Sequence, residues 1–139
     1  MFLLGVPLLI IPFAFYNFVV FLLPGLDWAQ PLAHVKMMSQ AIWTLTLGDL
    51  VVAVAVFILF LEVVKSIQAA RRSIVDHLLS LLLFLAMLAE FLLVKEAATA
   101  TFFLLLVTAF VDVIGGFAFS LKAIRRKVAF EGVDQVLPP

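Results

Sequence analysis

The chain has 139 residues and a formal net charge of zero; 66% of the residues are hydrophobic and only 13% are charged. A water-soluble domain is roughly 45–50% apolar and about 25% charged. The mean hydropathy of this chain is +1.29, and a chain this short leaves too much surface exposed to hide so many apolar side chains from water. The composition therefore excludes an ordinary soluble domain and indicates an integral membrane protein.

The charge balance, the absence of Cys and the absence of catalytic motifs exclude several classes of function. Nine basic residues balance nine acidic ones, so no excess positive charge points to nucleic acid. There is no Cys, which excludes disulfides, thiolate metal sites and c-type haem attachment. No phosphate-binding loop, nucleophile elbow or zinc-protease helix occurs in the sequence. We therefore predict no enzymatic activity, no metal site and no cofactor.

Four stretches reach the roughly 20 apolar residues that a membrane-spanning helix needs. They cover about residues 2–23, 41–64, 75–94 and 98–121. We predict an all-α membrane protein whose single domain, residues 1–139, is a compact bundle of four transmembrane helices. The first helix is expected to bend at Pro7 or Pro12. Residues 122–139 are expected to form a short cytoplasmic tail, which is extended over residues 131–139.

The basic residues predict the orientation of the bundle. Seven of the nine fall in the connection between the second and third spans or after the fourth span: Lys65, Arg71, Arg72, Lys122, Arg125, Arg126 and Lys127. The positive-inside rule assigns that side to the cytoplasm. With four spans, both the N-terminus and the C-terminus are then cytoplasmic.

The connection between the first two spans is long enough to have structure of its own. Asp27 and Gln30 have the spacing of an N-cap and its partner at the start of a helix. Trp28, Leu32 and Val35 would then form one apolar stripe on a short interfacial helix lying along the outer membrane surface. The alternative interpretation is an irregular loop.

Ionisable residues inside the spans are the candidate functional residues, since an acid at the bilayer centre costs several kcal/mol unless it faces protein or water. At about 1.5 Å per residue, Glu90, Asn17 and Asp49 lie about 6, 10 and 12 Å below the outer end of their spans. On the same scale Asp112 lies about 21 Å down and Glu62 about 30 Å down. The polar groups Asn17, Asp49, Glu90 and Asp112 thus step across the membrane.

The sequence leaves several roles open for these acids. Glu62 is expected to pair with Lys65 one turn away at the membrane interface. The other three acids have no basic residue within their spans, so each must be protonated, bond a neighbour such as Asn17 or Thr108, bind a cation, or meet a partner chain. One interpretation is that they hold the bundle together, and the others are a proton or cation pathway and a subunit contact.

Two pairs of basic residues mark the predicted cytoplasmic surface. Arg71-Arg72 and Arg125-Arg126 each follow an even-numbered span, where they are expected to extend to the interface or to contact lipid headgroups. His77 is expected to belong to a solvated cluster at the same surface. His34 lies in the outer connection, so the two histidines cannot ligate one haem within one chain.

The sequence predicts a small, non-enzymatic, multi-pass protein of the bacterial inner membrane. Its partners would be the lipid bilayer and either further copies of itself or a partner membrane subunit, so that it acts as an oligomerising or accessory subunit of a larger complex. The alternative function is a small proton- or cation-coupled transporter or channel that uses its intramembrane carboxylates. A membrane enzyme would need a nucleophile, a metal-ligand set or an oriented base, which the sequence does not supply.

Overall fold

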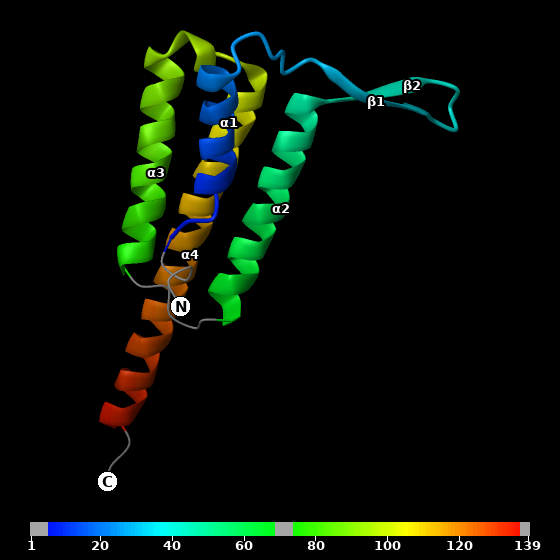
Figure 1. Ribbon diagram of the computed structural model, residues 1–139. Coiled ribbons are helices and arrows are strands. Elements are labelled where there is room, and N and C mark those ends of the chain that lie inside the picture. Colours follow the sequence, from blue (N-terminus) through cyan, green and yellow to red (C-terminus); the bar gives the residue numbers. More distant parts are fainter. Residues whose placement is uncertain (1–5, 69–73, 137–139) are drawn as a thin grey trace.

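The computed structural model describes residues 6–68 and 74–136 of the chain (Figure 1). Most of these residues are helical, and one two-stranded sheet interrupts the helices. In chain order the elements are α1 (Ile10–Leu22), β1 (Pro31–Lys36), β2 (Ile42–Thr46), α2 (Leu47–Gln68), α3 (Ile74–Leu93), the short 3-10 helix η2 (Lys95–Ala97) and α4 (Ala100–Val136).

Three of the helices, α2, α3 and α4, are long and apolar enough to cross a membrane. This confirms the helical class and the apolar character expected of a membrane protein. The fourth apolar helix, α1, has 13 residues. At about 1.5 Å per residue it is roughly 20 Å long, which is shorter than a hydrocarbon core of about 30 Å. The structure therefore supports three full-length spans and one shorter apolar helix within the described residues.

The prolines of the first apolar stretch mark the start of α1, so the expected bend at Pro7 or Pro12 is wrong. Pro7 precedes the helix, and its carbonyl accepts a hydrogen bond from Ile10 N–H at 3.1 Å. Pro12 lies in the first turn of α1, where the missing N–H has no helical partner to lose. The helix therefore begins where the prolines are tolerated.

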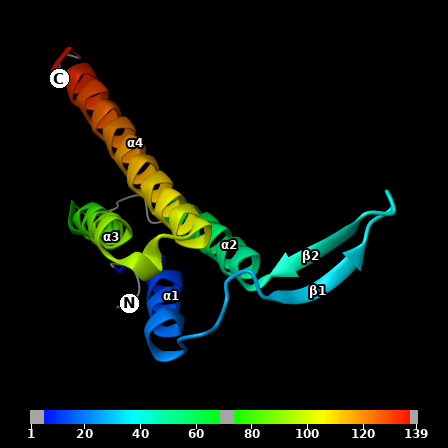
Figure 2. The same ribbon diagram turned by 90° about the horizontal axis from the view of Figure 1, so that it is seen from above.

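The helix α4 forms the centre of the bundle. It packs along both α2 and α3, and α1 contacts α2 and α4. Viewed from above in Figure 2, the other three helices lie around its first half. Tyr16, Met87 and Phe102 are the largest apolar side chains that this packing removes from solvent. They come from α1, α3 and α4, and Val51 and Ala55 of α2 belong to the same buried cluster, so the core joins all four helices.

A β-hairpin replaces the short interfacial helix predicted for the first connection. Its strands pair antiparallel, with Val35 opposite Trp43 and His34 opposite Thr44. Asp27 uses its side chain to accept the N–H of Ala29 at 3.0 Å, which closes a local turn instead of starting a helix. The second strand lies in residues that composition alone assigned to the second span, so the sequence analysis did not recognise the partner of β1.

The hairpin projects sideways from one end of the bundle, which we call the hairpin end (Figure 1). The connection between α3 and α4, including η2, lies at the same end. At the opposite end α4 continues well past α2 and α3 (Figure 1). The predicted tail after residue 121 continues this helix as far as Val136, so the extended conformation expected from residue 131 is wrong for residues 131–136. Residues 121–131 contain no Gly or Pro to interrupt it.

Candidate functional site

The first candidate contact joins α1 to α3 near the hairpin end. The side-chain amide of Asn17 donates to Glu90 Oε2 at 3.3 Å and to the carbonyl of Phe13 at 3.1 Å. Both Asn17 and Glu90 are half-buried. Of the options that the sequence left open for Glu90, the structure therefore shows a hydrogen bond to Asn17.

Tyr16, which the sequence analysis did not select, anchors a second and more deeply buried contact. Its side chain has no solvent exposure. Its hydroxyl donates to the carbonyl of Glu96 at 2.8 Å and lies 2.7 Å from Thr99 Oγ1. Because the single tyrosine proton goes to Glu96, the Thr99 hydroxyl donates to Tyr16 and accepts the N–H of Phe102 at 3.2 Å.

Aromatic packing holds Tyr16 in this position. Its ring stacks on Trp28 with centroids 4.4 Å apart and planes 3° apart, and it meets the edge of Phe102 at 4.9 Å. Three separate parts of the chain thus converge on one ring. The only sequence signal was that the single Tyr of the chain stands beside Asn17 in an otherwise apolar stretch.

Asp49 has a local structural role, and the expectation that it has no local partner is wrong. It is exposed in the first turn of α2, where its Oδ2 accepts the N–H of Thr46 at 3.0 Å and the hydroxyl of Thr46 at 2.7 Å. Thr46 Oγ1 in turn accepts the N–H of Asp49 at 3.2 Å. This reciprocal pair is a capping box, and the spacing Thr46-x-x-Asp49 before an apolar run could have identified it.

Glu62 is buried within the protein and makes a contact with a second element that its expected pairing with Lys65 did not include. Only 2% of the residue is exposed. Its Oε2 accepts the N–H of Leu8 at 3.0 Å, just before α1 begins. A carboxylate at this position also complements the partial positive charge of the helix N-terminus. Glu62 therefore connects α2 to the start of α1.

Asp112 and Ser80 are buried at a similar depth. Asp112 is 4% exposed and Ser80 3%. At about 1.5 Å per residue, Glu62, Asp112 and Ser80 lie roughly 22, 18 and 20 Å along their helices from the hairpin end. We call these three residues the buried polar layer. Neither acid is without a polar partner, whereas Ser80 Oγ has no hydrogen-bond partner among the described residues.

The hydroxyl proton of Thr108, which was expected to bond Asp112, is donated to a backbone carbonyl. The hydroxyl of Thr108 donates to the carbonyl of Leu104 at 2.8 Å, one turn back in α4. Its single proton is therefore used within the helix backbone. The structure thus brings Asn17 and Glu90 together, places Asp49 at the surface of the hairpin end and buries Asp112 further along the bundle.

The histidines lie at opposite ends of the molecule, as expected. His34 Nδ1 is 3.0 Å from Thr44 Oγ1 across the hairpin. His77 is half-buried, and its Nε2 shares a hydrogen bond with Ser120, which joins α3 to α4. Among the described residues, no group of three or more His, Cys, Asp or Glu side chains could hold a metal ion.

Only one of the two basic pairs lies among the residues that the structure describes. Arg125 and Arg126 are exposed on the part of α4 that extends past the other helices. Arg71 and Arg72, the other predicted headgroup contacts, lie outside the described residues.

One open pocket of about 390 Å³ lies at the hairpin end between the C-terminal turn of α1, the following connection and Glu96. Trp28 and Phe21 supply aromatic wall, and Glu96 is the only carboxylate of its lining. The pocket does not reach Glu90, Asn17 or the buried polar layer, so it is separate from the intramembrane acids.

Comparison with known proteins adds no assignment. No family model, curated protein or solved structure matches this chain. Any function must therefore be argued from the surfaces and polar contacts described above.

Proposed function

We propose that this chain is a small non-enzymatic membrane protein that acts as an oligomerising or accessory subunit of a bacterial inner-membrane complex. In this proposal the hairpin end faces the periplasm and the extension of α4 faces the cytoplasm. The basic residues Lys122, Arg125, Arg126 and Lys127 on that extension support the orientation through the positive-inside rule.

A long apolar stripe on α4 carries the proposal. Exposed apolar side chains recur along this helix at alternating spacings of four and three residues, which is the heptad pattern of helices that pack on a partner helix. The stripe consists of Phe103, Val107, Phe110, Ile114, Phe117, Leu121, Ile124 and Val128.

The extension distinguishes this stripe from a face that only meets lipid. The helix has 37 residues, so it is roughly 56 Å long at about 1.5 Å per residue, against a hydrocarbon core of about 30 Å. The bond between His77 and Ser120 places the start of α3 beside residue 120 of α4. Leu121, Ile124 and Val128 therefore continue the stripe where neither α2 nor α3 covers it, and Ile124 is 58% exposed.

The polar contacts of three acids support a structural role for them. Glu90 bonds Asn17, Asp49 caps α2, and Glu62 accepts the N–H of Leu8. Each contact joins or terminates elements of this chain. These acids accordingly help to define the shape of the subunit, and the stripe on α4 offers the surface for a partner helix.

Cysteine cross-linking in membranes tests the proposal, because the native chain has no Cys. Ile124→Cys places a thiol on the stripe, and Arg126→Cys places one on the other side of the same helix as a matched control. Oxidation should give a cross-linked dimer, or a cross-link to a copurifying subunit bearing a Cys, with Ile124→Cys and much less with Arg126→Cys. Absence of any cross-link at residue 124, together with a monomer after gentle solubilisation, would contradict the proposal.

The buried polar layer favours a second candidate function, proton- or cation-coupled transport. Two carboxylates and a serine hydroxyl, from three helices, are buried at one depth, and such groups are frequent in intramembrane proton and ion pathways. Flux into proteoliposomes separates the two functions. Transport predicts that Glu62→Gln or Asp112→Asn abolishes flux while the capping variant Asp49→Asn retains it; no flux in the wild type removes this candidate.

A further inference from the structure

The β-hairpin has two faces of different chemistry. Successive residues of a strand point to opposite sides, and the observed register places Val35 opposite Trp43 and Ala33 opposite Leu45. These four residues form one face, which we call the apolar hairpin face. The other face carries His34, Lys36 and Thr44, together with the exposed Ile42, and the hydrogen bond between His34 and Thr44 spans it. Leu32 is also exposed and lies at the register shift between Pro31 and Ala33, without a cross-strand partner.

The chain itself leaves most of the apolar hairpin face uncovered, and only Leu45 among its four residues is half-buried. All six residues of β1 are exposed, and Trp43 keeps 48% of its surface exposed. A two-stranded hairpin is marginally stable by itself in water. The apolar hairpin face is therefore expected to contact an environment that is less polar than water.

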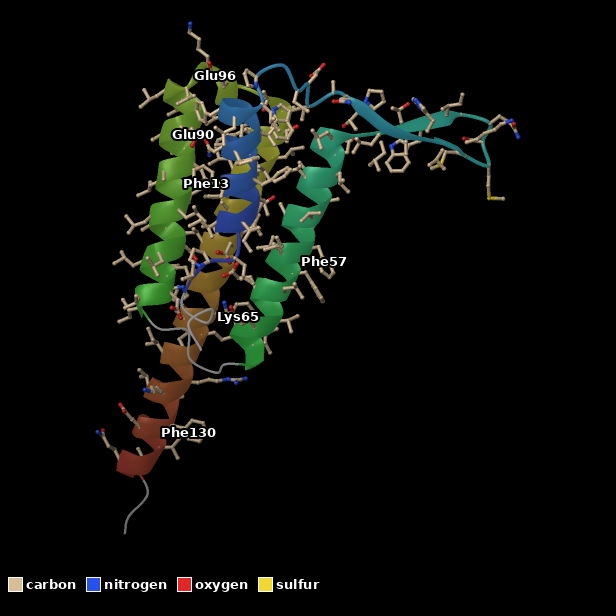
Figure 3. All side chains as sticks on the ribbon, in the orientation of Figure 1. Phe13, Phe57, Lys65, Glu90, Glu96 and Phe130 are labelled. Carbon is tan, nitrogen blue, oxygen red and sulfur yellow. The ribbon has the colours of Figure 1, made fainter. Side chains whose placement is uncertain are left out.

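The position of the hairpin indicates that this environment is lipid. The hairpin extends sideways over the same side of α2 to which Phe57 points (Figure 3). That side of α2 is an exposed apolar stripe formed by Leu50, Val54, Phe57 and Leu61. Because α2 is long and apolar enough to cross a membrane, this stripe meets lipid, and the hairpin overhangs the end of that lipid-facing surface.

The base of the hairpin is fixed to the bundle. The N–H groups of Leu47 and Gly48 donate to the carbonyls of Gln30 and Trp28 at 3.0 and 2.9 Å. The last residue of β2, Thr46, also caps α2. Because no linker separates β2 from α2, the hairpin is held at the end of the membrane-spanning helices.

Backbone chemistry limits how deep the hairpin can lie. Each strand has one free edge whose N–H and C=O groups need water or headgroup partners, so the hairpin cannot enter the hydrocarbon core. The apolar face in turn disfavours full immersion in water. The boundary between headgroups and acyl chains meets both requirements, and Trp is enriched there.

We propose that the hairpin is an interfacial anchor that lies on the lipid surface, with the apolar hairpin face in contact with lipid and Lys36 on the aqueous side. The anchor would fix the depth and rotation of α2 in the bilayer. It involves the hairpin end alone and is independent of any partner bound to α4.

Spin-label accessibility tests this anchor in the full chain. Residues 35 and 36 are adjacent and lie on opposite faces, so Val35→Cys and Lys36→Cys compare the two faces at one position along the hairpin. Phe57→Cys serves as the lipid reference and Ser39→Cys, in the turn, as the water reference. The labelled proteins are reconstituted into vesicles of phosphatidylethanolamine and phosphatidylglycerol, and relaxation by oxygen and by a water-soluble nickel chelate is measured.

The expected result is a several-fold higher ratio of oxygen to nickel accessibility at residue 35 than at residue 36, with residue 35 shallower than residue 57. Equal nickel accessibility at residues 35 and 36 would overturn the proposal by placing the hairpin in water. Low accessibility of residue 35 to both reagents would also overturn it, because protein would then cover the face. Unchanged far-UV circular dichroism confirms that each labelled variant is folded.

Discussion

Replacement of Gly48 by alanine tests whether the close approach of α2 to α4 is as tight as the structure indicates. A Cβ added at Gly48 would overlap Thr101 Oγ1 and would lie 3.2 Å from the carbonyl oxygen of Trp28. The backbone cannot simply move apart, because the N–H of Gly48 donates to that same carbonyl at 2.9 Å. Overpacking of this kind costs about 1–3 kcal/mol.

Gly115→Ala in α4 is the matched control. A Cβ at Gly115 meets no atom within 4 Å, so this variant should gain up to about 1 kcal/mol from the higher helix propensity of alanine. The free energy of unfolding, measured in mixed micelles by titration with a denaturing detergent and followed by circular dichroism, should therefore fall for Gly48→Ala and rise or stay level for Gly115→Ala. The difference between the two variants should be about 1–4 kcal/mol.

A double variant identifies the colliding atom. Thr101→Ala removes the hydroxyl that overlaps the new Cβ, so Gly48→Ala should cost less in the Thr101→Ala background than in the wild type, with a coupling of about 0.5–3 kcal/mol. If Gly48→Ala is as stable as the wild type, the packing described for α2 and α4 is refuted. If the cost is unchanged in the double variant, the clash is not with Thr101.

Three further predictions concern the polar contacts. Tyr16→Phe leaves the carbonyl of Glu96 without the tyrosine donor, so the free energy of unfolding should fall by about 1–3 kcal/mol; an unchanged value would show that this hydroxyl contributes nothing. Asn17→Leu removes the donor to Glu90 and should destabilise the bundle, whereas the same change in a Glu90→Leu background, which has no acceptor, should cost less; equal costs would exclude a direct coupling. Asp49→Ala should lower the thermal midpoint slightly, because the helix cap is lost, and it should leave any transport rate unchanged. A reduced flux in a variant of unchanged stability would contradict the assignment of Asp49 as a capping residue.

The sequence by itself predicted that this protein is suited to a membrane and where its main helices lie. The runs of apolar residues around α2, α3 and α4 are a property of local composition, so they predicted three long membrane-compatible helices without any tertiary information. The capping box of Thr46 and Asp49 is equally local, because both residues lie within one turn. The sequence contained that signal, but counting residues 41–46 as part of a span concealed it.

The tertiary structure decided which residues meet across the chain. The hairpin replaces the expected interfacial helix because β1 finds its partner in β2, and the sequence of residues 27–35 does not contain that partner. Tyr16 becomes central because Trp28, Glu96 and Thr99 converge on it from distant parts of the chain. Periodicity and hydropathy describe single elements, whereas hydrogen bonds such as these depend on how the elements pack. That physical difference is why the membrane class could be inferred from the sequence and the contacts of its acids could not.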